Sequence, residues 1–264
     1  MAEMKRTPEM KSWRVQSPDS PGFHTVVAPD RSASVVSYIF RLNLQAGETY
    51  ELSSGKLEMA PVLIKGSAQL SGHPILTKAV KRFDSFYIPA ETTVAITAGE
   101  DCVFYIGGAE YAGIGDAFFR AYDRELPLGD IHQIHGSGAG EREVMFTLDP
   151  GTPASRLICG LTWGSDGGWT SWPAHQHEND LEEVYCYFDM PAPRCGFHLA
   201  YLESGGIADC VPYFVQSGTM VQAPRGYHPT VAVPGTRNAY FWVLVAFEPK
   251  SRRYDLAVSD PALL

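Results

Sequence analysis

The sequence contains no run of about 18 consecutive apolar residues, so a membrane-spanning helix is not expected. It has no basic stripe, and its formal net charge of −9 disfavours nucleic acid as a partner. The 5 cysteines form no CxxC pair, which predicts reduced and mostly buried thiols. The stretch from Met1 to Trp13 lacks the apolar core of a secretion signal, which favours a cytoplasmic protein.

The composition instead favours many short strands joined by turns. The 264 residues include 25 glycines, 19 prolines, 13 phenylalanines and 13 tyrosines. Candidate strands such as 37–44, 92–98 and 102–106 alternate with turn signals at a spacing of about 8–12 residues, which is typical of all-β sandwiches and barrels. One short helix is expected around residues 116–124. The length fits two domains of about 130 residues each.

The two halves of the chain resemble each other in the order of their segments. Residues 83–89, 94–96 and 103–105 have partners in 217–224, 231–233 and 240–242. This order predicts a duplicated β-barrel. The expected division is an irregular N-terminal arm (1–35), an N-terminal barrel (36–110), a connector (111–140), a C-terminal barrel (141–250) and a tail (251–264).

One segment of the second half carries a metal-ligand pattern. His175 and His177 are two residues apart, so on an extended strand both imidazoles face the same side. A turn at 178–180 returns the chain, which lets a carboxylate on the next strand join them. His228 offers a third imidazole at the start of a later strand. The pattern predicts one divalent metal ion per chain.

Glu182 and Glu183 compete for the carboxylate position, because only one of two neighbouring strand residues can face inward. Glu183 shares its face with Tyr185 and Tyr187, a set that suits a wet cavity, and we therefore select Glu183. Three imidazoles and one carboxylate favour zinc or manganese, with iron, nickel or cobalt possible, whereas calcium and magnesium prefer oxygen ligands.

The first half lacks an equivalent set. His73 is its only histidine between residues 38 and 110, and Thr93 stands where the second half has His228. The N-terminal barrel is therefore expected to bind no metal and to serve as a structural partner.

Four segments, 40–49, 168–177, 181–185 and 226–235, resemble the cupin superfamily. More narrowly, they resemble the family of 5-deoxy-glucuronate isomerase and 4-deoxy-L-threo-5-hexosulose-uronate isomerase. The resemblance implies a bicupin, with two tandem double-stranded β-helix (jelly-roll) barrels. The family's metal ligands fall on the four residues selected above. The sequence departs from the family pattern at Leu161, where a glutamate is expected.

The resemblance also implies an activity, the aldose–ketose isomerisation of a deoxyuronate such as 5-deoxy-glucuronate in inositol catabolism. Such a reaction passes through an enediol and needs a group that moves a proton. The candidates for that group are Tyr185, Tyr187, Tyr201, Tyr227, Glu178 and Glu182, of which we select Tyr185 and Tyr201. Arg225, three residues before His228, is the candidate partner of the substrate carboxylate. The absence of lysine between residues 151 and 249 disfavours a Schiff base in this barrel.

Two other functions fit the same ligand pattern. An Fe(II) cupin dioxygenase can use identical ligands, and a cupin can bind a sugar without catalysis. In each case the expected partner is a small molecule, with neither nucleic acid nor membrane, and the exposed barrel edges favour a homo-oligomer.

Overall fold

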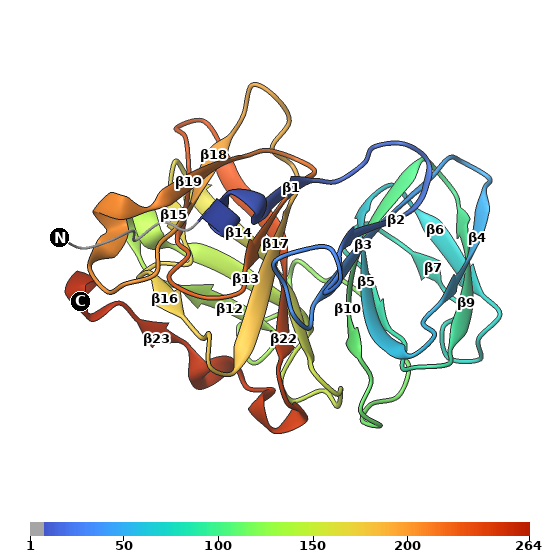
Figure 1. Ribbon diagram of the computed structural model, residues 1–264. Coiled ribbons are helices and arrows are strands. Elements are labelled where there is room, and N and C mark those ends of the chain that lie inside the picture. Colours follow the sequence, from blue (N-terminus) through green and yellow to red (C-terminus); the bar gives the residue numbers. More distant parts are fainter. Residues whose placement is uncertain (1–7) are drawn as a thin grey trace.

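The computed structural model of the chain describes residues 8–264, which form two β-lobes that lie side by side (Figure 1). Each lobe contains one large and one small antiparallel sheet. Among the described residues, every helical segment is a single short 3-10 turn, and none is long and apolar enough to cross a membrane. These turns are η1 (Pro8–Ser12), η2 (Gly138–Gly140), η3 (Gly206–Asp209), η4 (Pro249–Ser251), η5 (Tyr254–Leu256) and η6 (Pro261–Leu263).

The N-terminal barrel combines a six-stranded and a four-stranded sheet. The large sheet has the order β11 (Phe118–Arg120), β8 (Ser85–Tyr87), β5 (Leu57–Lys65), β10 (Cys102–Glu110), β3 (Tyr38–Leu44) and β2 (Gly22–Val27). The small sheet has the order β4 (Thr49–Ser53), β9 (Thr93–Ala98), β6 (Ala68–Ser71) and β7 (Ala79–Val80). Buried apolar side chains, including Leu42, Leu63 and Phe104, fill the space between them.

The C-terminal barrel repeats this plan. Its large sheet has the order β1 (Arg14–Gln16), β20 (Thr219–Ala223), β17 (Leu181–Tyr187), β22 (Arg237–Ala246), β14 (Leu157–Asp166), β13 (Arg142–Leu148) and β12 (His132–His135). Its small sheet has the order β15 (Trp169–Thr170), β21 (Thr230–Ala232), β18 (Gly196–Ala200) and β19 (Val211–Val215). A separate ribbon pairs β16 (His175–Gln176) with β23 (Val258–Ser259).

The duplication predicted from the segment order is confirmed strand by strand. The central strands β8, β5, β10 and β3 of one large sheet occupy the places that β20, β17, β22 and β14 occupy in the other. The small sheets correspond in the same way, β4-β9-β6-β7 to β15-β21-β18-β19. The all-β architecture of two tandem barrels is therefore as expected.

The two large sheets pack against each other through their outer faces. Alternation along β17 shows how: Val184 and Cys186 lie in a core shared with residues of the N-terminal barrel, whereas Tyr185 and Tyr187 lie in the interior of their own barrel. Because neighbouring strand residues point to opposite faces, one strand contributes to both cores. All 5 cysteines are free, and 3 of them are buried, in line with the predicted thiols.

Two buried glutamates connect the barrels in a reciprocal way. The carboxylate of Glu58 on β5 accepts hydrogen bonds from the backbone N–H groups of Ser155, Arg156 and Leu157, where the chain enters β14. The carboxylate of Glu182 on β17 accepts equivalent bonds from residues 35–37, where the chain enters β3. Each barrel thus contributes a buried glutamate that binds the backbone at the start of a strand in the other barrel. Both carboxylate oxygens of Glu182 accept hydrogen bonds in this contact.

Two expectations about the segments outside the barrels are wrong. The arm is not irregular in its described part, because β1 pairs with β20 and β2 pairs with β3, with prolines 18, 21 and 29 left outside these strands; residues 1–7 lie outside the described residues. No helix forms at 116–124: β11 pairs with β8, since the unpaired edge of that strand outweighs a weak helical preference. The connector and the tail also supply strands, β12 and β23.

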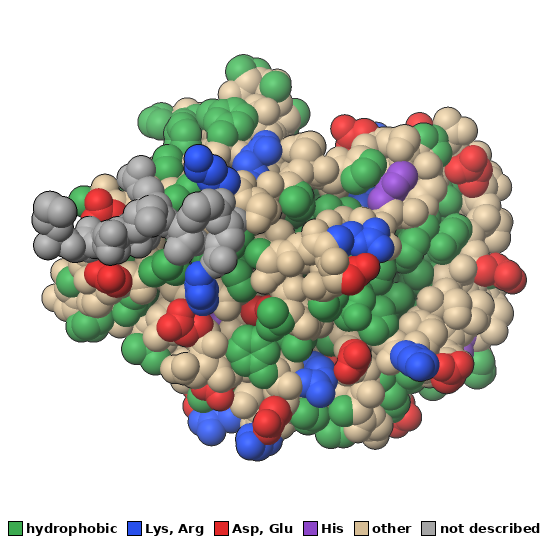
Figure 2. Space-filling view, viewed as in Figure 1, with side chains coloured by type: hydrophobic (Ala, Val, Ile, Leu, Met, Phe, Trp, Pro, Cys, Tyr) green, Lys and Arg blue, Asp and Glu red, His purple; other side chains and the backbone are tan. Residues whose placement is uncertain are grey.

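The surface carries charges of both signs. On the face shown in Figure 2, the described lysine and arginine side chains lie singly or in small groups among acidic ones. Exposed charges arranged in this way keep a protein soluble without forming an extended field of one sign.

Candidate metal centre

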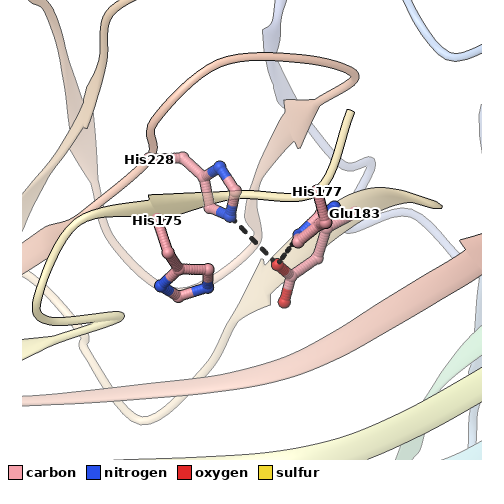
Figure 3. Close-up of side chains that lie close together, drawn as sticks. All are labelled: His175, His177, Glu183 and His228. Carbon is pink, nitrogen blue, oxygen red and sulfur yellow. Dashed lines mark hydrogen bonds and ion pairs between the residues drawn. The ribbon is translucent and has the colours of Figure 1, made fainter. Parts of the chain in front are cut away.

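Four side chains converge in the interior of the C-terminal barrel. His175 lies on β16, His177 lies just after it, Glu183 lies on β17 and His228 lies two residues before β21. One potential ligand atom from each lies within 4.8 Å of the others. Figure 3 shows the three imidazoles and the carboxylate pointing toward a common centre. These are the four residues that the sequence analysis selected.

Backbone carbonyls orient the three imidazoles. The Nδ1 atoms of His175, His177 and His228 lie 3.2, 3.0 and 2.8 Å from the carbonyl oxygens of Pro173, Leu181 and Gly226. An Nδ1–H that donates to a carbonyl leaves the Nε2 lone pair free for a metal. The local backbone therefore fixes the tautomer that metal binding requires.

The donor set fits a divalent transition-metal ion. Nε2 of His228 is buried and has no hydrogen-bond partner among the described residues, although it lies 3.2 Å from Oε2 of Glu183. Nε2 of His177 lies at the same distance from that oxygen. Two metal–ligand bonds of about 2.0–2.2 Å place their ligand atoms at most about 4.4 Å apart, so separations of up to 4.8 Å need to contract by only a few tenths of an ångström. The cluster can therefore hold one such ion.

The electrostatics favour the protonation states that bind metal. Burial alone would raise the pKa of Glu183, but hydrogen bonds from His177 and His228, when these rings carry a proton on Nε2, outweigh burial and hold the pKa well below its usual range. A metal ion in place of those protons would likewise keep the carboxylate ionised. Burial, reinforced by the neighbouring imidazoles of His228 and His177, lowers the pKa of His175 to about 3. Near neutral pH the site thus presents a carboxylate beside a neutral imidazole.

A short hydrogen-bond chain supports the carboxylate. The hydroxyl of Tyr185 donates to Oε2 of Glu183 at 3.0 Å, and the hydroxyl of Ser171 lies 2.9 Å from that of Tyr185. Since the single Tyr185 proton goes to the carboxylate, Ser171 is the donor in the second bond. Burial raises the pKa of Tyr185 well above its usual value, with the charge of Glu183 adding to the effect, so the phenol stays protonated.

A cavity of about 220 Å³ opens onto the cluster. This volume lies below the ~300–1,000 Å³ of pockets for drug-sized molecules and suits a ligand the size of a monosaccharide. His175, His177 and Glu183 line one part of it. The rest of the wall includes His135, Arg142, Thr162, Ser171, Trp172, Tyr185, Tyr240, Trp242 and Tyr254.

Comparison with known proteins identifies the family to which this site belongs. The sequence profile of the KduI/IolB family matches residues 12–262. The chain belongs to the KduI/IolB family. The same comparison agrees with the resemblance drawn from the sequence segments.

Other members and neighbours of the KduI/IolB family are distant in sequence. The 5-deoxy-glucuronate isomerase of Geobacillus kaustophilus is 28% identical over 218 residues, which cover 76% of this chain and 76% of that one. The 5-deoxy-glucuronate isomerase of Halalkalibacterium halodurans is 26% identical over 262 residues, which cover 90% of each chain. An IolB-like protein from Salmonella typhimurium superposes with a TM-score of 0.83 at 21% identity, covering 95% of this chain and 97% of that one. A variant of Bacillus subtilis oxalate decarboxylase reaches 0.61 at 14% identity, covering 94% and 79%. These two likenesses confirm the bicupin fold.

Two of the residues predicted to act in catalysis lie away from the cavity of this KduI/IolB protein. Arg225 lines a different cavity, beside Trp13 and Pro224. The hydroxyl of Tyr201 donates to the carboxylate of Asp260 and does not line the wall. Tyr185 does lie at the cluster. The catalytic roles of all three stay predictions.

Arg142 and Tyr254 were not predicted, because both lie far in sequence from the four proposed metal ligands. Arg142 begins β13, and its position at the cavity depends on how the first strands of the barrel fold over β14. Leu161, which departs from the family pattern, faces the core between the barrels, while its neighbour Thr162 faces the cavity. No signal in the sequence alone distinguishes those faces.

The C-terminal tail of this family member supports the metal centre directly. β23 pairs with β16, which carries His175, and the N–H of Asp260 donates to the carbonyl of Ala174 at 2.7 Å. The side chain of Asp260 is fully buried and accepts bonds from the Tyr201 and Ser204 hydroxyls and from two backbone N–H groups. The tail is therefore a wall of the site.

Replacing this anchor should loosen the tail and the strand beside it. In Asp260→Asn one acceptor oxygen becomes a donor that faces other donors, so we expect faster amide hydrogen exchange in residues 254–264 and at 175–176. Asp255→Asn is the matched control, because Asp255 is 67% exposed on the same segment. Equal exchange in the two variants would contradict the anchoring role.

The anchor should also weaken in acid. Burial alone would raise the pKa of Asp260, but the hydrogen bonds that it accepts lower the pKa from 3.8 to about 2. A lowered carboxyl pKa means stability that is complete above pH 3.8 and is lost as pH falls toward 2. Wild-type exchange in the tail should approach that of Asp260→Asn only within that interval.

Proposed function

We propose that this protein is a metal-dependent aldose–ketose isomerase that acts on a deoxyuronate such as 5-deoxy-glucuronate, a step of inositol catabolism. The observation that carries the proposal is the convergence of three oriented imidazoles and one carboxylate at a cavity of monosaccharide size. The 5-deoxy-glucuronate isomerases among the relatives support the choice of substrate. Zinc or manganese is the proposed ion.

The reaction balances without an oxidant or a second substrate. A proton leaves the carbon next to the aldehyde, an enediol forms, and a proton is delivered to the former aldehyde carbon while the hydroxyl proton moves between the two oxygens. A divalent ion bound here would polarise the carbonyl and stabilise negative charge on its oxygen. The product is an isomer of the substrate, so no other cofactor is needed.

For this chemistry, the residues of the chain would orient the metal-ligating groups and limit water around the reacting carbons. The Tyr185 hydroxyl and the imidazoles hold the Glu183 carboxylate in one orientation. Trp172, from the loop before β16, and Tyr254, from the tail, line the cavity, where their rings would limit the access of water to the reacting carbons. These contacts of Glu183 would keep the metal-ligating oxygen in a fixed position while charge develops on the substrate.

The assay for this proposal follows 5-deoxy-glucuronate by NMR in deuterated water. We expect conversion to the ketose with deuterium at the carbon that receives the proton, loss of turnover after treatment with EDTA, and recovery on adding back zinc or manganese. Deuterium incorporation is the mark of an enediol that exchanges with solvent. Turnover that is unchanged after the metal has been removed would contradict the proposal.

The same purified protein separates the alternatives. A dioxygenase would contain iron and would consume oxygen together with its substrate. A sugar-binding cupin would bind the deoxyuronate in calorimetry but leave it unchanged in the NMR assay. Either result, with no isomerisation in the presence of metal, would replace the proposed activity.

A further inference from the structure

The cavity of the metal centre has a single fixed positive charge in its wall. Among the described residues that line it, Arg142 is the only lysine or arginine and Glu183 the only aspartate or glutamate. Because Glu183 belongs to the proposed ligand set, Arg142 is the only permanently charged group left to face a ligand. A deoxyuronate carries a carboxylate, so the position of this cation matters for the proposed substrate.

One nitrogen of the Arg142 guanidinium, Nη1, is bound to the protein backbone. Its Nη1 atom donates to the carbonyl oxygens of Trp172 at 2.8 Å and Gly140 at 3.2 Å. Within residues 8–264, its Nε and Nη2 atoms have no hydrogen-bond or ion-pair partner, and they are not sealed in the protein interior. Two parallel N–H groups on one edge form the fork that binds a carboxylate with two hydrogen bonds.

The glycine-rich turn before Arg142 fits this arrangement. Gly136 has a φ of +72°, and a Cβ there would lie 2.3 Å from the carbonyl oxygen of Gly140 and 3.2 Å from Nη1 of Arg142. Glycine at 136 therefore lets the Gly140 carbonyl approach the guanidinium closely. The turn therefore packs closely against the arginine.

A neutral imidazole lies next to the Arg142 cation. His135 pairs with Arg142 across β12 and β13 and lines the same cavity. Burial, with the charge of Arg142 as a second cause, lowers the pKa of His135 below its ordinary value of 6.5. The imidazole is therefore neutral near pH 7, and its Nε2 atom lies 2.7 Å from Oε1 of Gln133, so it adds no second positive charge beside the ligand.

We propose that Arg142 is the specificity-determining residue that binds the carboxylate of the substrate through Nε and Nη2, and so places the aldehyde end at the metal centre. This inference rests on the proposed function for the identity of the ligand. It assigns to Arg142 the part that the sequence analysis gave to Arg225, which lines another cavity.

The test compares 5-deoxy-glucuronate with its uncharged carboxamide. Calorimetry gives Kd for both ligands, and the NMR assay gives KM and kcat, on wild type, Arg142→Gln and Arg142→Lys. We expect wild type to bind the acid about ten- to a hundredfold more tightly than the amide, and Arg142→Gln to lose this preference. Arg142→Lys should be intermediate, since an ammonium group keeps the charge but not the fork.

Control variants make the result specific. Arg31→Gln removes a cation that is 58% exposed and pairs with Asp30, and it should keep the preference for the acid. Arg225→Gln tests the competing assignment, and a preference lost there but retained in Arg142→Gln would overturn the inference. A preference that survives in Arg142→Gln but disappears with EDTA would assign the carboxylate to the metal instead.

The two proposals fail in different ways. If wild type binds the acid selectively through Arg142 but does not turn it over, the isomerase proposal fails and the binding site stands. If wild type isomerises the acid and the amide with equal KM, the activity stands and the role of Arg142 is refuted.

Discussion

His177→Ala should contain less than about one-tenth of an equivalent of metal and should lose at least about a thousandfold in kcat/KM, while its far-UV circular dichroism stays that of wild type. His177 supplies one of three imidazoles and contacts the Glu183 carboxylate, so its removal leaves an incomplete donor set. The barrel should persist, because apolar side chains such as Phe146 and Trp242 form its core. Elemental analysis of the purified variant measures the first effect directly.

His73→Ala is the matched control, because His73 lies in the N-terminal barrel and outside the ligand cluster. It should keep the metal content and the activity of wild type. A full equivalent of metal in His177→Ala would show that the ion binds elsewhere, and the ligand assignment would then fall.

Glu58→Ala should lower the free energy of unfolding by about 3–5 kcal/mol. The carboxylate is completely buried and accepts three backbone N–H groups and the hydroxyl of Tyr87, all of which lose their acceptor at once. Urea unfolding followed by tryptophan fluorescence measures the loss, since Trp163 packs on Phe83 where the barrels meet. Because the contact spans both barrels, we expect the interface to separate earlier in the transition.

Glu51→Ala provides the comparison, because Glu51 lies on β4 of the same barrel with its side chain exposed. Substitutions at such surface positions usually change stability by no more than about 0.5 kcal/mol. If Glu58→Ala unfolds at the same urea concentration as Glu51→Ala, the carboxylate does not hold the barrels together.

The parts of the fold that follow local rules could be predicted from the sequence. Strand alternation and regular turn spacing indicated two similar barrels, and the alternation along β17 separated Glu183 from Glu182 because one strand has only two faces. The pairing of His175 with His177 came from the same rule. These predictions concern residues that are close together in the chain, so the sequence alone is sufficient to make them.

The parts that depend on distant segments could not be predicted. The segment at 116–124 became a strand because β8 offered it an edge, and the sequence does not say which edges remain open. Arg142 was not predicted, because it lies far before His175 in the sequence and only the folding of the first strands of the barrel brings it to the cavity. Arg225 was chosen for its closeness in sequence to His228, and closeness in sequence does not determine which cavity a side chain enters.

The pairing of β1 with β20 has a consequence for biosynthesis. Arg14 aligns with Val221, so β1 must wait for some two hundred further residues to be synthesised before its partner strand exists. Contacts of such long sequence separation form slowly and late. The barrel that carries the histidines can therefore close only after β20 has been synthesised, and until then β1 is an unpaired strand that chaperones can bind.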